Sequence, residues 1–330
     1  MVLVKLALFL AGCLILVKSA SILVNSLAKI AAYFRISDFV IGFIVMAFAT
    51  SIPDLTVGLS SAFGSTADNP LTSMALGSVI GANIIELTLV IGIMAIIRRD
   101  IRVETKAVRT DTMYMFLVVA IPLVLMMDQT LSQLDGLILV SVFAVYMLRL
   151  LSQKSQFRSK DAEQTEKVSK NEFRKNLAFT LLSVVLLFVG ANLLVTNGGE
   201  MAAYLGVPQI IVGLFMISLG TTLPELTFET KAVLSAHPYM ALGDMIGSII
   251  ANSTLVLGLT AIVFPITAGD FVIYMTSAFF MLTVAFLFMT FIEAERHILW
   301  QEGIGLVLLY VLFVIVELSI HQFEVAQAVG

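Results

Sequence analysis

The sequence VIGFIVMAFATSIPDLT, residues 40–56, recurs in altered form as IVGLFMISLGTTLPELT at residues 211–227. Each copy carries a proline followed by an acidic residue inside an apolar run. The same offset of 171 residues aligns the triplet AAY at 31–33 with a second AAY at 202–204. Because one unbroken register joins these matches, the sequence predicts two related halves.

A second pair of stretches extends the repeat. MALGSVIGANIIELTLVIG, residues 74–92, aligns with MALGDMIGSIIANSTLVLG, residues 240–258, at an offset of 166 residues. The two alignments therefore differ only by a shorter loop between them. We assign residues 1–152 to the first half, 153–175 to a linker and 176–330 to the second half.

The composition indicates a membrane protein. Hydrophobic residues make up 59% of the 330 residues and charged residues only 13%, and the mean hydropathy is +1.02. A soluble domain carries about 25% charged residues, and a bilayer-spanning helix needs about 20 mostly apolar residues. Ten stretches approach that length, near 3–24, 38–63, 72–97, 110–127, 133–150, 176–197, 208–234, 239–264, 271–292 and 303–321.

Each half thus contains five predicted spans, and an odd number of spans reverses the side of the membrane on which the second half begins. The two halves are therefore expected to lie upside down relative to each other. The predicted fold is an all-α polytopic membrane protein with about ten transmembrane helices in two inverted five-helix repeats. Inverted repeats of this kind are an architecture of secondary transporters.

The basic residues predict the orientation in the membrane. Of the 19 lysines and arginines, 17 fall in the odd-numbered connections between spans. The positive-inside rule places those connections, including the mixed-charge linker 153–175, in the cytoplasm. Both termini of this multi-pass cell-membrane protein are then outside. The basic residues are topology signals, so the lipid bilayer is the expected partner and a nucleic acid is not. The sequence is compatible with a monomer.

The two prolines leave backbone carbonyls unpaired in the middle of the apolar runs. Pro53 cannot donate a hydrogen bond to the Ala49 carbonyl, and Pro224 leaves the Gly220 carbonyl without its usual donor. An unsatisfied carbonyl is costly in hydrocarbon and is tolerated only where it faces protein or a wet cavity. Such a carbonyl can coordinate a cation.

Oxygen-bearing side chains surround these breaks on shared helical faces. The second and seventh spans contribute Thr50, Ser51, Asp54, Thr221, Thr222 and Glu225, and the third and eighth spans contribute Ser78, Glu86, Ser248 and Asn252. A site built from oxygen atoms suits hard cations, Ca²⁺ above all among divalent ions. The motifs hold no histidine or cysteine that would favour zinc or copper.

At these residues the chain resembles the cation/calcium exchanger superfamily, which includes sodium/calcium exchangers of prokaryotic type. Its pattern is two inverted repeats, each with a helix carrying G/A-T/S-S-hydrophobic-P-E and then a helix carrying G-N-x-x-G-S/A. The resemblance implies an antiporter that exchanges Ca²⁺ for Na⁺ by alternating access, not an enzyme, and it implies no cofactor. The ion ligands that it implies are Ala47, Thr50, Ser51, Asp54, Glu86, Ser218, Thr221, Thr222, Glu225, Ser248 and Asn252.

The sequence departs from this pattern in its acids. Asp54 stands where the family usually has glutamate. In the sodium/calcium branch the position of Glu86 is commonly asparagine and that of Asn252 commonly aspartate, so one acid has changed halves. The roles of Glu229 and Asp244, nearer the cytoplasmic ends of their helices, are left open between the vestibule and structure.

Alternatives to Na⁺/Ca²⁺ exchange follow from the same residues. A carboxylate alone can carry a proton, so H⁺/Ca²⁺ antiport is the second reading, whereas several neutral oxygens per repeat favour Na⁺. The same oxygens could line the filter of a cation channel. An intramembrane aspartyl protease would use Asp54 with Asp244, but it gives no reason for the repeated threonine, proline and acid.

Overall fold

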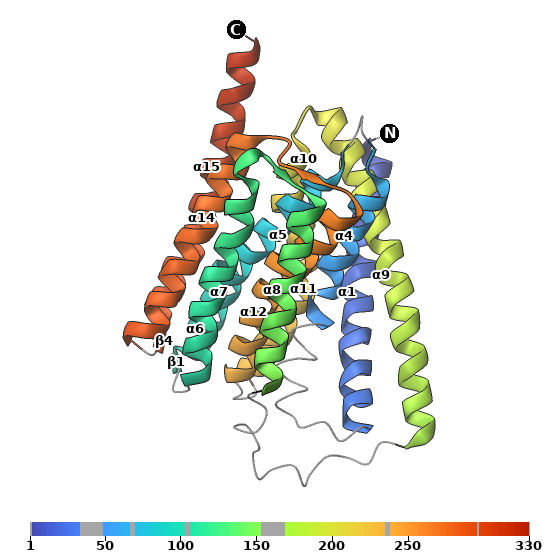
Figure 1. Ribbon diagram of the computed structural model, residues 1–330, viewed down its shortest axis with the longest axis vertical. Helices are drawn as coiled ribbons and strands as arrows, with labels where there is room; N and C mark the ends of the chain where they lie inside the picture. The colour runs from blue at the N-terminus through green and yellow to red at the C-terminus, as the bar shows by residue number, and fades with distance from the viewer. Residues whose placement is uncertain are drawn as a thin grey trace.

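The structure is a computed structural model in which residues 2–33, 49–66, 70–102, 106–152, 169–234, 238–295 and 297–329 are described. The chain forms a bundle of helices (Figure 1). The first half contains α1 (Val2–Tyr33), α4 (Ile52–Gly64), α5 (Thr72–Ile85), η2 (Glu86–Val90), α6 (Ile91–Arg98), α7 (Lys106–Leu125), η3 (Met126–Asp128) and α8 (Gln133–Ser152).

The second half repeats this order of elements. It contains α9 (Lys170–Leu205), α10 (Gln209–Ile211), η5 (Val212–Ile217), α11 (Ser218–Leu234), α12 (Pro238–Ala251), η6 (Asn252–Val256), α13 (Leu257–Val263), α14 (Phe271–Thr290), η7 (Phe291–Glu295) and α15 (Trp300–Val329). Nine helical segments among the described residues are long and apolar enough to cross a membrane. The remaining predicted span, 38–63, is described only from residue 49 onward and contains α4, which begins at Ile52. The predicted all-helical membrane fold is confirmed.

One helix begins well before its predicted span. The sequence predicts a span from residue 176, whereas α9 begins at Lys170. The Glu172 N–H donates to Ser169 Oγ at 3.2 Å, and the Ser169 N–H donates to Glu172 Oε2 at 2.8 Å. This capping box satisfies backbone donors of the first turn and fixes the helix start in the polar region ahead of the span.

The first helices of the two halves run in opposite directions side by side. In Figure 1, α1 descends from the N-terminus while α9 rises from the lower end of the bundle. They pack closely along their length. A Cβ atom on Gly12 would lie 2.9 Å from the Gly190 carbonyl oxygen, so the two backbones approach as only glycines allow. This antiparallel pair agrees with inverted halves.

Two short strand pairs show the same relation. Strand β1 (Asp100–Arg102) pairs antiparallel with β4 (His297–Leu299), and β2 (Thr130–Leu131) pairs antiparallel with β3 (Ile266–Thr267). In their respective halves, β1 and β3 follow the third span, and β2 and β4 follow the fourth. Exchanging the halves therefore converts one pair into the other. Figure 1 shows β1 and β4 at the lower end, whereas β2 directly precedes α8 at the upper end.

Close glycine contacts inside the bundle are also related by exchanging the two halves. A Cβ atom on Gly92 of α6 would lie 2.7 Å from the Gly303 carbonyl oxygen of α15, and one on Gly136 of α8 would lie 2.6 Å from the Gly258 carbonyl oxygen of α13. Gly92 and Gly258 are separated by the repeat offset of 166 residues. Each half therefore crosses the other with the same glycine-to-glycine packing.

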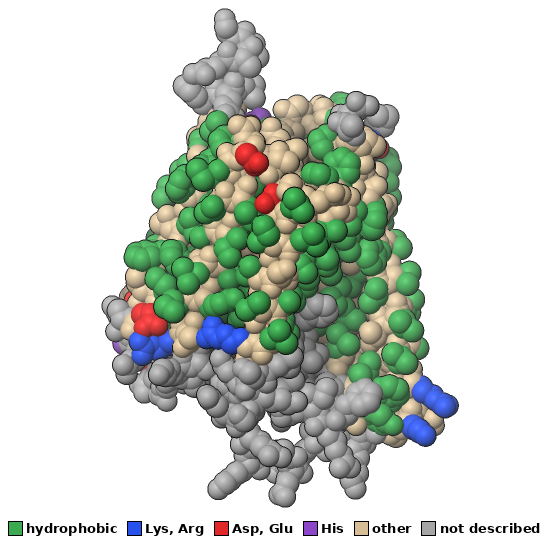
Figure 2. Space-filling model, in the orientation of Figure 1, with side chains coloured by type: hydrophobic (Ala, Val, Ile, Leu, Met, Phe, Trp, Pro, Cys, Tyr) green, Lys and Arg blue, Asp and Glu red, His purple; other side chains and the backbone are tan. Residues whose placement is uncertain are grey.

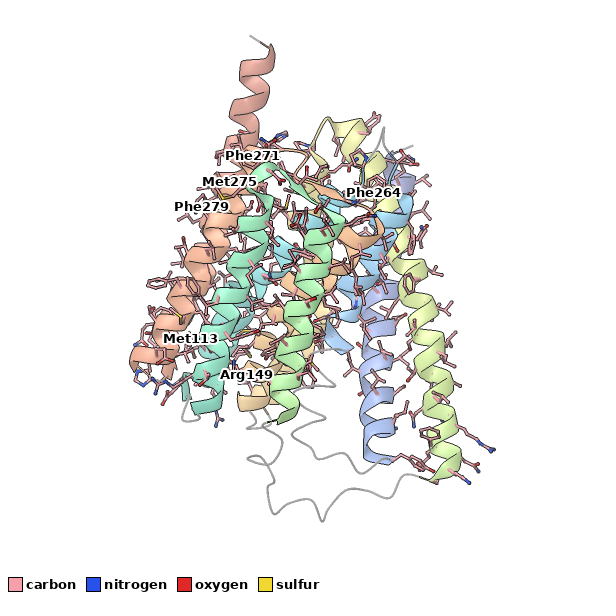
Figure 3. The ribbon with its side chains drawn as sticks, in the orientation of Figure 1. Met113, Arg149, Phe264, Phe271, Met275 and Phe279 are labelled. Atoms are coloured by element: carbon pink, nitrogen blue, oxygen red, sulfur yellow. The ribbon has the colours of Figure 1, made fainter. Side chains whose placement is uncertain are left out.

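The outer surface is apolar and the interior is partly polar. Figure 2 shows hydrophobic side chains over most of the visible face, with the described lysines and arginines at its lower end. Leu181 and Leu308 are 62% and 61% exposed, as lipid-facing residues would be. Arg149, at the lower end of α8 (Figure 3), lies 3.7 Å from Asp111 and over the ring of Tyr114.

The placement of the chain ends leads to a topology prediction. The start of α1 and the end of α15 lie at the upper end of the bundle in Figure 1, opposite the end of α8 and the start of α9. Residues 153–168 lie outside the described residues, and the positive-inside rule predicts that they are cytoplasmic. In a Cys13→Ser background, we expect Ser155→Cys to react with a membrane-impermeant maleimide only after cells are permeabilised.

The matched control is Asp128→Cys, in η3 at the end of the bundle opposite Arg149. This cysteine should react with the same reagent in intact cells. Labelling of Ser155→Cys from outside intact cells, with Asp128→Cys protected, would reverse the predicted topology.

Candidate functional site

Seven acidic side chains are buried among the described residues, and five of them form one neighbourhood. Asp111 and Glu317 lie apart: Asp111 faces Arg149, and Glu317 accepts hydrogen bonds from Thr276 at 3.1 Å and Ser277 at 2.9 Å. The other five, each at most 1% exposed, are Asp54, Glu86, Glu225, Glu229 and Asp244.

No described lysine, arginine or histidine is fully buried with these acids. Ionised carboxylates in a membrane interior are stable only beside compensating charge. The described part of the chain supplies no such buried charge, so among these residues only bound cations or protons would offset the charge of the acids.

Two π-helical turns present the central residues of the third and eighth spans. Element η2 begins at Glu86 and η6 begins at Asn252, at the repeat offset of 166 residues. In η2 the Ile91 N–H bonds to the carbonyls of Glu86 and Thr88, and η6 repeats this pattern. A π turn rotates the residues before it relative to those after it and often marks a functional site. No sequence pattern indicated these turns.

The prolines act differently in the two halves. Pro53 lies in the first turn of α4, so the backbone there begins a helix. The predicted interruption at Pro224 is wrong, because α11 continues through it. The hydroxyls of Thr221 and Thr222 both donate to the Ser218 carbonyl, at 3.1 and 2.8 Å. These hydroxyl bonds go to the Ser218 carbonyl and not to the Gly220 carbonyl, whose usual donor Pro224 removes.

Asp54 meets the eighth span across the interface between the halves. Asn252 Nδ2 donates to Asp54 Oδ2 at 3.3 Å. Asp54 Oδ1 and Asn252 Oδ1 are buried, and no described residue forms a hydrogen bond with either oxygen. The Thr221 hydroxyl also lies against the Asp54 carboxylate. Two unpaired oxygen acceptors therefore remain at this contact.

Ser248 is the hub of the site. Its Oγ lies 3.0 Å from Glu86 Oε1 and 2.7 Å from Glu225 Oε1, and it accepts a hydrogen bond from Ser51 Oγ at 3.1 Å. One hydroxyl has one proton, so it can donate to only one of the two carboxylates at a time. Glu86 Oε2 and Glu225 Oε2 have no partner.

Glu86 and Glu225 also face each other directly. Their carboxyl groups are within hydrogen-bonding reach of one another, and both feel the charge of Asp54. Two ionised carboxylates this close in a buried site repel strongly. The contact therefore requires either a shared proton or a cation beside it. The contacts of Ser248 with Glu86 and Ser51, and of Asn252 with Asp54, each join a residue of the first half to one of the second.

The structure brings some of the predicted ligands together between the halves, whereas others bond only within their own span. The described ones are all buried, at most 3% exposed, and Thr50, Ser51, Asp54, Glu86, Glu225, Ser248 and Asn252 meet across the interface between halves. Ser218, Thr221 and Thr222 donate their hydroxyl protons to carbonyls of their own helix. Ala47 lies outside the described residues.

Sequence reasoning underestimated Glu229 and Asp244. Both are 0% exposed, and Thr50 Oγ1 donates to Asp244 Oδ1 at 3.2 Å. The signal was present in the spacing, since Glu229 follows Glu225 by one helical turn and Asp244 precedes Ser248 by one turn. Asp54 accepts a hydrogen bond from Asn252 and Asp244 accepts one from Thr50.

Carboxylates alone do not form a metal cage in this conformation. Within the described residues, no three acidic, histidine or cysteine side chains are grouped closely enough to hold a metal ion. A cation here would therefore combine one or two carboxylates with hydroxyl, amide and carbonyl oxygens. Mixed sets of six to eight oxygens are typical of Ca²⁺.

Comparisons with known proteins agree with this architecture. Residues 4–152 and 175–318 match the family described as "Sodium/calcium exchanger protein". The chain is 25% identical over 353 residues to the sodium/calcium exchanger MaX1 of Methanosarcina acetivorans, covering 96% of this chain and 99% of that protein.

Solved structures give the same result. The sodium-calcium exchanger NCX_Mj superposes with a TM-score of 0.65 at 27% identity, covering 95% of this chain and 99% of that one. The H⁺/Ca²⁺ exchanger CAX superposes with a TM-score of 0.76 at 14% identity, covering 98% of this chain and 86% of that one. At this low identity the similarity shows a shared fold and nothing further. The chain belongs to the sodium/calcium exchanger protein family, a family of multi-pass membrane transporters and not of enzymes.

Proposed function

We propose that this protein exchanges Ca²⁺ for Na⁺ across the membrane by alternating access. The ions would bind between the halves, to Asp54, Glu86 and Glu225 together with the neighbouring hydroxyl, amide and carbonyl oxygens. The observation that carries this proposal is the set of unpaired, fully buried oxygens on Asp54, Glu86, Glu225 and Asn252, without a buried basic residue in the described chain.

The ligand chemistry supports Ca²⁺ as one transported ion. Three central carboxylates supply more negative charge than one Ca²⁺ neutralises, and Ser51, Ser248 and Asn252 supply neutral oxygens beside them. Ca²⁺ accepts such irregular oxygen sets, whereas Mg²⁺ demands near-ideal octahedral geometry and dehydrates reluctantly.

The neutral oxygens favour Na⁺ as the counter-ion. A small monovalent cation that leaves water needs several oxygens in place of its hydration shell. The Thr221 hydroxyl lies against the Asp54 carboxylate, and the Thr222 hydroxyl and the Ser218 carbonyl follow on the same helix. The similarity to MaX1 and to NCX_Mj, both named as sodium–calcium exchangers, points the same way.

Proton coupling is the second candidate, because one contact favours it. The facing carboxyl groups of Glu86 and Glu225 could be bridged by a proton as well as by a cation. The two candidates make opposite predictions about the gradient that drives Ca²⁺ uptake.

We expect a Na⁺ gradient to drive Ca²⁺ uptake into proteoliposomes that contain the purified protein. Outwardly directed Na⁺ should raise the initial rate at least about tenfold over an imposed pH gradient in sodium-free buffer, because Na⁺ would occupy oxygens that a proton cannot use. Protein-free liposomes under the same gradients measure leakage. Equal uptake under the pH gradient, unaffected by added Na⁺, would establish proton coupling instead.

A further inference from the structure

We propose that Glu229, Asp244 and Thr50 form a second Ca²⁺ site, beside the central site and toward the end of the bundle where α11 connects to α12. The proposed Ca²⁺ exchange supplies the identity of the ion. The existence of the site rests on the contacts of these three residues.

The three side chains converge from three helical segments. Thr50 lies two residues before the start of α4 at Ile52, Glu229 lies on α11 and Asp244 lies on α12. Thr50 Oγ1 donates to Asp244 Oδ1 at 3.2 Å. The Glu229 carboxylate is close enough to interact electrostatically with the Asp244 and Glu225 carboxylates. The proposed site is therefore next to the central one, with Glu229 one helical turn along α11 from Glu225.

Unpaired atoms indicate that a ligand is needed there. Both carboxylate oxygens of Glu229 and Oδ2 of Asp244 are buried without a hydrogen-bond partner among the described residues, and both residues are 0% exposed. An ionised carboxylate left in this state is strongly unfavourable. Two carboxylates and a hydroxyl supply two negative charges and oxygen ligands, which together match one Ca²⁺ ion.

The charge balance favours a second ion. Five buried carboxylates lie in this neighbourhood, and the described chain buries no basic side chain with them. One Ca²⁺ at the central site leaves most of that charge uncompensated. A second divalent ion between Glu229 and Asp244 brings the neighbourhood close to neutrality, at a position one helical turn from Glu225.

The first half contains no acids that correspond to Glu229 and Asp244. By the repeat offsets, Glu229 corresponds to Gly58 and Asp244 corresponds to Ser78. A Cβ atom on Gly58 would lie 2.3 Å from the Thr260 hydroxyl oxygen, so no side chain fits at that position. The second site is therefore a departure from the symmetry of the repeat, confined to the end predicted to be cytoplasmic.

Equilibrium binding of ⁴⁵Ca²⁺ to the purified protein in sodium-free buffer tests the proposal. We expect about two ions per chain for the unmodified protein and about one for Glu229→Gln, Asp244→Asn and the double variant. The matched control is Glu317→Gln, another buried membrane acid with its own hydroxyl partners, which should keep both ions. Size-exclusion elution and thermal melting of each variant establish that it is folded.

The possible outcomes distinguish the proposed second site from the proposed Ca²⁺ exchange at the central site. One bound ion that is lost in Asp54→Asn and unaffected in the Glu229→Gln/Asp244→Asn double variant would overturn the second site and leave Ca²⁺ exchange standing. No Ca²⁺ binding by the folded, unmodified protein would overturn both. If a single variant fails to fold, Glu229→Asp, which keeps the charge and shortens its reach, should retain about two ions with at least one weakened.

Discussion

Asp54→Asn and Glu225→Gln are each expected to lower Ca²⁺ uptake in proteoliposomes at least about 100-fold while leaving folded protein in the membrane. The amide keeps the shape of the side chain and removes the charge that faces the ion. Removing one partner of a buried charge pair costs about 3–5 kcal/mol, and each 1.4 kcal/mol is about a tenfold change in an equilibrium constant.

Two measurements keep this prediction testable. Detergent-solubilised variants should elute as one symmetric peak with the retention of the unmodified protein, which excludes misfolding as the cause of lost transport. Glu317→Gln again serves as a control, because the Glu317 carboxylate accepts hydrogen bonds from Thr276 and Ser277, whereas Ser248 contacts Glu86 and Glu225. Transport near the unmodified rate in either Asp54→Asn or Glu225→Gln would remove that residue from the proposed site.

The next largest effect on Ca²⁺ uptake is expected at Glu86, the acid that has changed halves. Glu86→Asn alone is expected to lower Ca²⁺ uptake about 100-fold, because it removes one of the two carboxylates that meet at Ser248. Combining it with Asn252→Asp returns a carboxylate to the neighbourhood from the opposite half. Because Asn252 already contacts Asp54, we expect the double variant to transport at least about tenfold faster than Glu86→Asn.

The comparison that decides this prediction is Asn252→Asp alone. With Glu86 present, a fourth central carboxylate next to Asp54 adds repulsion, so this single variant should be slower than the unmodified protein. A double variant no faster than Glu86→Asn would show that the position of the acid matters and that the total charge does not suffice.

The fold could be predicted from the sequence because its signals are local or linear. A run of about 20 apolar residues specifies a membrane helix by its length alone, and the described helices follow the predicted spans, as α14 at Phe271–Thr290 follows the predicted 271–292. The repeat offsets relate the halves without reference to contacts. The doubled motif also indicated the acids, since a carboxylate in an apolar run is costly unless it has a function.

The contacts within the site were decided only by the tertiary structure. Ser248 reaches both Glu86 and Glu225 only because α11, α12 and η2 are suitably rotated about their own axes. These helices are buried on most sides, so the pattern of apolar residues does not specify their rotation. The π turns at Glu86 and Asn252 set part of this rotation and leave no sequence pattern.

The sequence by itself determined that this chain is a membrane protein of two inverted halves with a cluster of acids at their interface, because helix length, polarity and repetition are properties of the chain alone. Only the tertiary structure decided that Glu229 and Asp244 belong to the buried cluster and that α11 continues through Pro224. The reason is that burial and helix continuity depend on neighbouring segments. Thr50, ahead of α4, reaches Asp244 from the other half of the chain, and a helix packed inside the bundle can continue through a proline that removes one donor.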